Sequence, residues 1–136
     1  MKEIIVPANI EHMEEILEFI NQELENVDCP MKTQMKIDIT LDEIFTNIAS
    51  YAYLSDSGKV TVRIKIEGNP LFAEIQFLDS GVPYNPLETD APDITLSAEE
   101  RDIGGLGIFI AKKSMDSMDY HYEDGQNVLT IKKFLI

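Results

Sequence analysis

Residues 32–53 carry apolar side chains at every third or fourth position, and this pattern constrains the fold more than any other feature of the sequence. The spacing is typical of a helix that packs one face against a core. The residues that share this face are Ile37, Leu41, Ile44, Ile48 and Ala52. The sequence therefore predicts a long core helix around which the other elements are arranged.

A short strand and one further helix are expected before this core helix. The strand covers residues 3–6, and Asn9 is a suitable N-cap for a helix that runs to about residue 27. Pro30 then suits the first turn of the core helix, so only a short break separates the two helices. The apolar residues of the first helix that are expected to face inward are Ile10, Met13, Ile16, Leu17, Ile20 and Leu24.

Two β-hairpins are expected after the core helix, with a third helix between them that begins at a run of glycines. Gly68-Asn69-Pro70 forms the turn of the first hairpin, and residues 124–127 form the turn of the second. The expected strands are 60–66 and 71–78, then 118–122 and 128–135. Strands and helices do not alternate regularly, so we expect an α+β fold. This fold is a two-layer sandwich in which a mixed, mainly antiparallel sheet has its helices on one face.

The composition indicates one cytoplasmic domain covering residues 1–136. No apolar run approaches the roughly 20 residues of a membrane span, and the N-terminal apolar segment is too short for a secretory signal. The lone Cys29 cannot form an internal disulfide, which agrees with a reducing compartment. The net charge of −14 argues against nucleic acid or an anionic membrane as a direct partner.

Glu43 and Asn47 lie four residues apart on the core helix, so they share one face at the edge of the apolar stripe. A carboxylate can accept a proton, and an amide oxygen can bind a hard cation such as Mg²⁺. The pair is equally compatible with an ordinary solvated helix edge. The two residues are therefore candidates for a site only in combination with other motifs.

Two later motifs could form a site together with Glu43 and Asn47. Gly104, Gly105 and Gly107 precede a helix, where free backbone N–H groups can bind a phosphate or can simply begin the helix. Asp79 ends a strand, and Gly81 follows it. The carboxylate could accept a hydrogen bond from an exocyclic amine while the glycine admits a flat base, or it could only stabilise a turn.

The order of these motifs resembles that of the Bergerat-fold (GHKL) ATPases. An acid and an asparagine on a helix come first, an Asp-x-Gly motif follows a strand, and a glycine-rich turn opens a second helix. Within that group the chain is similar to the single-domain serine/threonine kinases that act as bacterial anti-sigma factors. The resemblance covers nearly the whole chain and rests chiefly on residues 41–53, 79–86 and 104–113.

The resemblance implies that the chain binds ATP and Mg²⁺, with Asn47 as the metal ligand and Glu43 as the general base. Asp79 would bind the adenine amine, and the glycines would hold the phosphates. Residues 82–103, which lack apolar periodicity, would form a lid over the nucleotide. The residues expected around ATP are Asn47, Asp79, Gly81, Arg101, Gly104, Gly105, Gly107 and Thr130.

Two functions remain open at this point. The first is an anti-sigma-factor kinase that phosphorylates a serine of an anti-sigma-factor antagonist and has a sigma factor as its other partner. The second is a switch that uses ATP or ADP only to gate a protein surface. Tyr51, which stands where relatives often have a histidine, and the stiff Val82-Pro83 start of the lid leave room for the switch. Relatives commonly pair, so a homodimer is a further expectation.

Overall fold

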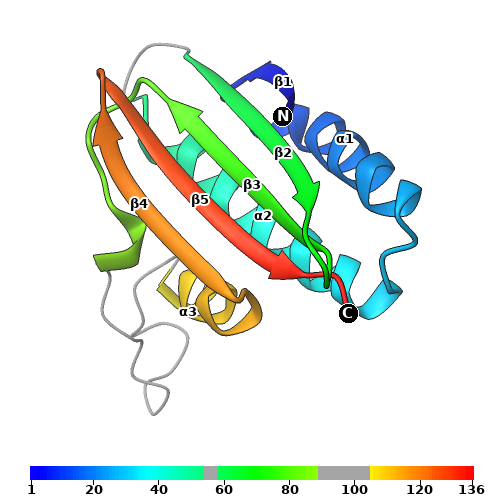
Figure 1. Ribbon diagram of the computed structural model, residues 1–136. Coiled ribbons are helices and arrows are strands. Elements are labelled where there is room, and N and C mark those ends of the chain that lie inside the picture. The colour runs from blue at the N-terminus through cyan, green and yellow to red at the C-terminus, as the bar shows by residue number, and fades with distance from the viewer. Residues whose placement is uncertain (54–57, 89–104) are drawn as a thin grey trace.

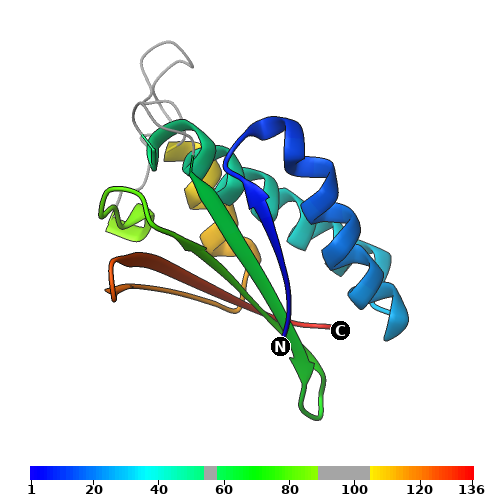
Figure 2. The same cartoon turned by 90° about the horizontal axis from the view of Figure 1, so that it is seen from above.

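In the computed structural model, which describes residues 1–53, 58–88 and 105–136, five antiparallel strands form one sheet and three α-helices cover one of its faces (Figure 1). The strand order is β1-β2-β3-β5-β4. The strands are β1 (Lys2–Pro7), β2 (Lys59–Glu67), β3 (Phe72–Asp79), β4 (Ser117–Glu123) and β5 (Gln126–Phe134), and the helices are α1 (Met13–Asn26), α2 (Met31–Tyr51) and α3 (Gly105–Ser114). The view in Figure 2 shows the helices on one side of the sheet, which confirms the predicted two-layer α+β fold.

The core helix α2 passes behind the central strands β3 and β5 (Figure 1). Its predicted apolar stripe is confirmed, since Ile37, Leu41 and Ile44 are at most 2% exposed. They belong to one core cluster with Ile75 and Ile131 of the sheet. Burial of one such side chain contributes about 1.5–3 kcal/mol, so this layer supplies much of the stability of the fold. None of the helices in the described ranges has the length and apolar character needed to cross a membrane.

The first helix differs from the prediction at its beginning. Asn9 is a cap, as expected, but its side chain accepts a hydrogen bond from the Glu11 backbone N–H at the start of a short 3₁₀ helix, Ile10–His12. The α-helix begins only at Met13. A 3₁₀ turn has three residues per turn, so the α-helical spacing does not apply to Ile10. Ile10 is 59% exposed, and its predicted inward orientation is wrong.

Both hairpins form, but the turn of the second is shorter than predicted. Asp124 and Gly125 alone make this turn, with φ values of 52° and 77°. Positive φ at both positions is what a two-residue type I′ turn requires, and glycine adopts it without strain. Strand β5 therefore begins at Gln126, and Asn127 lies in the strand instead of the turn.

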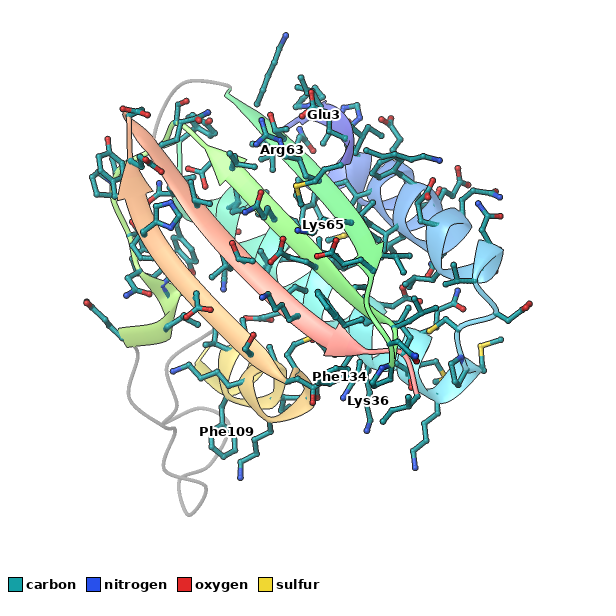
Figure 3. The ribbon with its side chains drawn as sticks, in the orientation of Figure 1. Glu3, Lys36, Arg63, Lys65, Phe109 and Phe134 are labelled. Carbon is teal, nitrogen blue, oxygen red and sulfur yellow. The ribbon has the colours of Figure 1, made fainter. Side chains whose placement is uncertain are left out.

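The open face of the sheet is polar and carries charged side chains from neighbouring strands (Figure 3). Glu74 lies between Lys65 and Lys132, with a nitrogen–oxygen distance of 3.4 Å to each. Arg63 pairs with Glu3 at 2.9 Å, and Figure 3 shows these two side chains close together. Exposed ion pairs of this kind contribute little stability, so their main effect is to keep this face compatible with water.

A buried carboxyl oxygen lies on the face of α2 that is turned toward α1. Oδ1 of Asp38 is inaccessible and has no hydrogen-bond partner among the described residues. Burial raises the pKa of Asp38, the Asn21 amide partly opposes this, and the nearby Glu25 carboxylate raises the pKa further. Protonation of Asp38 therefore favours the folded state, and the ionised form is destabilising above the pKa of the unfolded chain.

We expect Asp38→Asn to raise the free energy of unfolding at pH 7 by about 1 kcal/mol, because it removes a poorly solvated charge at almost constant volume. The gain should shrink as the pH falls through the raised pKa, where Asp38 becomes neutral in the folded protein. Urea unfolding from about pH 5 to pH 8 measures both effects. Asp42→Asn, which changes an exposed acid of the same helix, is the control. A loss of stability at pH 7 would contradict the prediction.

Candidate functional site

A pocket lies between α2, α3 and the helix-covered face of the sheet. The space in and in front of it amounts to about 480 Å³, a figure that includes open solvent. Most of its wall is apolar, with a few polar side chains at defined positions, which is the usual character of a small-molecule site. The lining residues are Ile44, Asn47, Ile48, Tyr51, Ala52, Phe77, Asp79, Val82, Tyr84, Pro86, Ile108, Tyr120, Asn127 and Leu129.

Asp79 supplies the buried carboxylate of this pocket. It is the last residue of β3 and only 4% exposed. Its Oδ1 accepts hydrogen bonds from the Gly81 backbone N–H at 3.0 Å and from the Asn127 side-chain amide at 2.9 Å. Burial raises the pKa of Asp79, and these two donors partly oppose the rise. No described residue donates to Oδ2, so this oxygen can accept a hydrogen bond from a ligand.

Gly81 brings the end of β3 against the end of α2. A Cβ atom on Gly81 would lie 2.2 Å from the backbone oxygen of Ala52, and the next residue, Val82, donates its N–H to the same oxygen at 3.0 Å. Beside this contact, the Tyr53 hydroxyl accepts a hydrogen bond from the Ser80 N–H at 2.8 Å. Only glycine allows this approach of two backbone segments, which explains the Asp-x-Gly motif on packing grounds.

Glu43 lies at the junction of α2 and α3. A Cβ atom on Gly107 would lie 2.1 Å from the carboxyl carbon of Glu43, so the Glu43 carboxyl group packs directly on that glycine. Burial raises the pKa of Glu43, a hydrogen bond from Asn47 lowers it, and the Asp42 charge raises it. The Asn47–Glu43 hydrogen bond is long, with 3.4 Å between Nδ2 and Oε1. Asn47 lines the pocket, whereas Glu43 is outside its lining.

Asn47 is suited to bind a hard cation that is also bound by the phosphates of a substrate. Its Nδ2 points toward Glu43, and no described residue donates to its Oδ1. In the described ranges, no group of three or more His, Cys, Asp or Glu side chains could hold a metal. Mg²⁺ is commonly held by one or two protein oxygens together with phosphates of a substrate. The donor set therefore fits a metal–phosphate complex better than a metal held by protein alone.

Thr130 is not among the residues that line this pocket, and its expected position beside adenine stays a prediction. In the β3–β5 register Thr130 stands opposite Gln76, and their side chains hydrogen-bond at 3.3 Å. Asp79 stands opposite Asn127, three residues from Thr130. Positions an odd number apart face opposite sides of a sheet, so Thr130 points to the open face.

Asn127 is the site residue that sequence reasoning missed, because the pattern placed it in a turn. It is 6% exposed and contacts Asp79 within the pocket. An Asp-Gly pair before it is the signal that could have identified it, since such a pair predicts a two-residue turn and moves the start of the strand forward.

Several expected site residues lie outside the part of the chain that the structure describes. These are Arg101, Gly104 and the lid beyond Glu88. Gly105 is the first residue of α3, and Gly107 lies in its first turn. The described start of the expected lid contains a short 3₁₀ helix, Pro86–Glu88, which α3 fastens through a hydrogen bond of 2.6 Å from Lys112 Nζ to the Leu87 oxygen.

A family model described as "Histidine kinase-like ATPase domain" matches residues 6–133. Two similar proteins are both named serine-protein kinase RsbW. The chain is 30% identical over 98 residues to the one from Bacillus mycoides (strain KBAB4) and 31% identical over 102 residues to the one from Listeria monocytogenes serotype 4a (strain HCC23). These alignments cover 69% and 71% of the chain but 60% and 63% of the relatives, so the chain spans about three fifths of their length.

A solved structure shares the fold. It is titled as the histidine kinase domain from the blue-light activated histidine kinase of Erythrobacter litoralis EL346. The superposition has a TM-score of 0.59 with 16% sequence identity, and it covers 96% of this chain and 62% of that chain. At this identity the likeness concerns the arrangement of helices and strands alone.

Proposed function

The chain belongs to the histidine kinase-like ATPase family, and we propose that it binds ATP together with Mg²⁺ and transfers the γ-phosphoryl group to a serine of another protein. The observation that carries this proposal is that Asn47 and Asp79, from separate elements, line one pocket with apolar walls. The pocket thus offers an oxygen for a metal and an oxygen for a base amine. The relatives named serine-protein kinase support the transfer step.

The base of ATP is proposed to lie between the apolar side chains of α2, β3 and α3, such as Ile48, Phe77 and Ile108. Oδ2 of Asp79 accepts a hydrogen bond from the adenine amine. The phosphates extend toward the start of α3, where the backbone N–H groups of Gly104, Gly105 and Gly107 bind them. Arg101 is proposed as an additional phosphate contact.

Asn47 is proposed to hold Mg²⁺ through its Oδ1, to which no residue of the described ranges donates, and its Nδ2 keeps the Glu43 carboxyl group nearby. When bound, the metal neutralises charge on the phosphates during transfer. Glu43 accepts the proton of the incoming serine hydroxyl. Burial raises the pKa of Glu43, which makes its carboxylate a stronger base than an ordinary exposed glutamate.

The proposed protein partners follow from the resemblance to bacterial anti-sigma-factor kinases. The substrate is an anti-sigma-factor antagonist, and a sigma factor is the second partner, so that phosphorylation regulates transcription indirectly. The net charge of −14 favours protein partners over direct contact with nucleic acid. Residues 1–136 act as one cytoplasmic ATP-binding domain in this proposal, with residues 82–103 as its lid. The proposal also includes a homodimer.

A second candidate function is a switch that binds ATP or ADP without transferring a phosphoryl group. The position of Glu43 favours it, because the carboxyl group packs on Gly107 and lies outside the pocket lining. In this case the nucleotide would only order a protein-binding surface. Replacement of Glu43 separates the two functions, since only the kinase depends on a general base.

Asn47→Ala is expected to remove the stabilisation that ATP provides in the presence of Mg²⁺. ATP at about 100 times its dissociation constant should raise the free energy of unfolding of the unchanged protein by about 2.7 kcal/mol. Thermal unfolding with ATP, with and without Mg²⁺, measures this as a higher midpoint. Asn26→Ala, which removes an exposed amide at the end of α1, should keep the full shift. If ATP stabilises none of these proteins, the proposed nucleotide site is wrong.

A further inference from the structure

Asn127 is held in one orientation at the buried end of the pocket. Its Oδ1 accepts hydrogen bonds from the Tyr84 backbone N–H at 3.1 Å and from the Tyr120 hydroxyl. Its Nδ2 donates to Asp79 Oδ1 at 2.9 Å and to the Val82 oxygen at 3.0 Å, with a longer approach of 3.4 Å to the Gly81 oxygen. The side chain thus connects β5 to β3, to β4 and to the segment that follows β3.

The partners of Asn127 determine which end of its amide points where. The Tyr84 N–H can only donate, and it meets the amide oxygen. The Asp79 carboxylate and the Val82 carbonyl accept, and they meet the amide nitrogen. A rotated amide would place its oxygen against a carboxylate and a carbonyl. The observed orientation is therefore the only one that satisfies this buried group.

This arrangement also fixes the carboxylate of Asp79. The amide of Asn127 and the N–H of Gly81 both donate to Oδ1, which leaves Oδ2 without a donor among the described residues. With only the Gly81 donor, the carboxylate could rotate and exchange its two oxygens. The second donor also favours the ionised form against the burial that raises the pKa of Asp79.

We propose that Asn127 is a positioning residue for nucleobase selectivity: it holds Asp79 so that one carboxylate oxygen remains directed at an exocyclic amino group of a purine. The inference rests on the proposed ATP-binding function and extends it. A purine that carries a carbonyl oxygen at the same position would place an acceptor against an acceptor, so it should bind more weakly. Selectivity for the amino group depends on Asn127 although Asn127 itself need not contact that group.

The test compares the binding of Mg²⁺-ATP and Mg²⁺-ITP by titration calorimetry, because ITP has a carbonyl oxygen where ATP has the amino group. The unchanged protein should prefer ATP by about tenfold or more, the effect of one hydrogen bond to a charged group. Asn127→Ala should lose most of this preference while ITP affinity changes by less than about threefold. Asp79→Asn should also lose the preference for ATP. Adding Asn127→Ala to Asp79→Asn should cause no further loss of this preference, because Asn127 acts through Asp79.

Two further variants keep the test decisive. Gln126→Ala changes the neighbouring residue on the opposite face of β5 and should retain the ATP preference. Tyr120→Phe removes one hydrogen-bond partner of Asn127 and should reduce the preference for ATP. This variant keeps the test usable if Asn127→Ala fails to fold. If the role of Asn127 were purely structural, Asn127→Ala would weaken the binding of ATP and of ITP equally.

An ATP preference that survives in both Asn127→Ala and Tyr120→Phe would overturn the inference alone. Failure of the unchanged protein to bind ATP would overturn the proposed function and the inference with it. The two failures are thus distinguished by the unchanged protein, whose binding is measured first.

Discussion

Glu43→Gln is expected to lower the rate of phosphoryl transfer to a serine by about 10²–10⁴-fold, the usual contribution of a general base. ATP affinity should stay within about twofold, because Glu43 lies outside the pocket lining and glutamine keeps its size. The amide cannot accept the hydroxyl proton at a useful rate. This combination separates a catalytic role of Glu43 from a role in holding the nucleotide.

The pH dependence of transfer gives an independent signature of Glu43. Burial is the main reason that the pKa of its carboxyl group is raised, so this group becomes protonated at a higher pH than an exposed glutamate. The base must be ionised to act, so the transfer rate should rise with pH through this raised pKa. The rise should be absent in Glu43→Gln, whose remaining activity has no carboxyl group at this position.

Single-turnover transfer from labelled ATP to a purified serine-bearing antagonist protein measures the rate, and calorimetry measures the affinity. Glu18→Gln, an exposed acid on α1, is the matched control and should behave as the unchanged protein. Equal transfer rates for Glu43→Gln and the unchanged protein would exclude Glu43 as the base. ATP binding without transfer in any of these proteins would favour the nucleotide-gated switch.

The fold could be predicted from local patterns because its elements have clear periods. The stripe of α2 repeats every three or four residues, and the hairpin strands alternate. The error at Ile10 arose where a 3₁₀ turn replaces the first turn of the expected helix. Such an exchange depends on how the chain leaves β1 to reach α1, and periodicity carries no information about that path.

The candidate site was less accessible to sequence reasoning, because its geometry depends on register between distant strands. Thr130 and Asn127 lie on the same strand, and only the pairing of β5 with β3 decides which of them meets Asp79. A shift of one residue in that pairing would exchange the two faces. The contact between Glu43 and Gly107 is likewise a product of helix packing, since the two residues are far apart in the sequence.

Alanine substitutions at two glycines should affect different properties, stability in one case and transfer rate in the other, although both add a methyl group to a crowded position. A Cβ on Gly81 would lie 2.2 Å from the Ala52 backbone oxygen, and a Cβ on Gly107 would lie 2.1 Å from the Glu43 carboxyl carbon. Backbone at the end of α2 cannot move without disturbing the pocket. The end of a glutamate side chain can rotate away at small cost.

We expect Gly81→Ala to lower the free energy of unfolding by about 3 kcal/mol, as overpacking against backbone does, and to lower the unfolding midpoint by roughly 10 °C. Gly107→Ala should change the free energy of unfolding by less than about 1 kcal/mol, because alanine favours the helix and offsets the displaced carboxyl group. Its transfer rate should nevertheless fall by about tenfold or more, because small displacements of a catalytic group are costly. Thermal unfolding and single-turnover transfer of the two variants measure these differences.

The comparison of the two glycines tests the site as a geometric unit. If Gly107→Ala retained full transfer activity, the observed position of the Glu43 carboxyl group would not be the one used in catalysis. If Gly81→Ala were as stable as the unchanged protein, the contact between the ends of β3 and α2 would have to adjust freely. Each result bears on a different contact, because Gly107 acts through the proposed base and Gly81 through the backbone that supports Asp79.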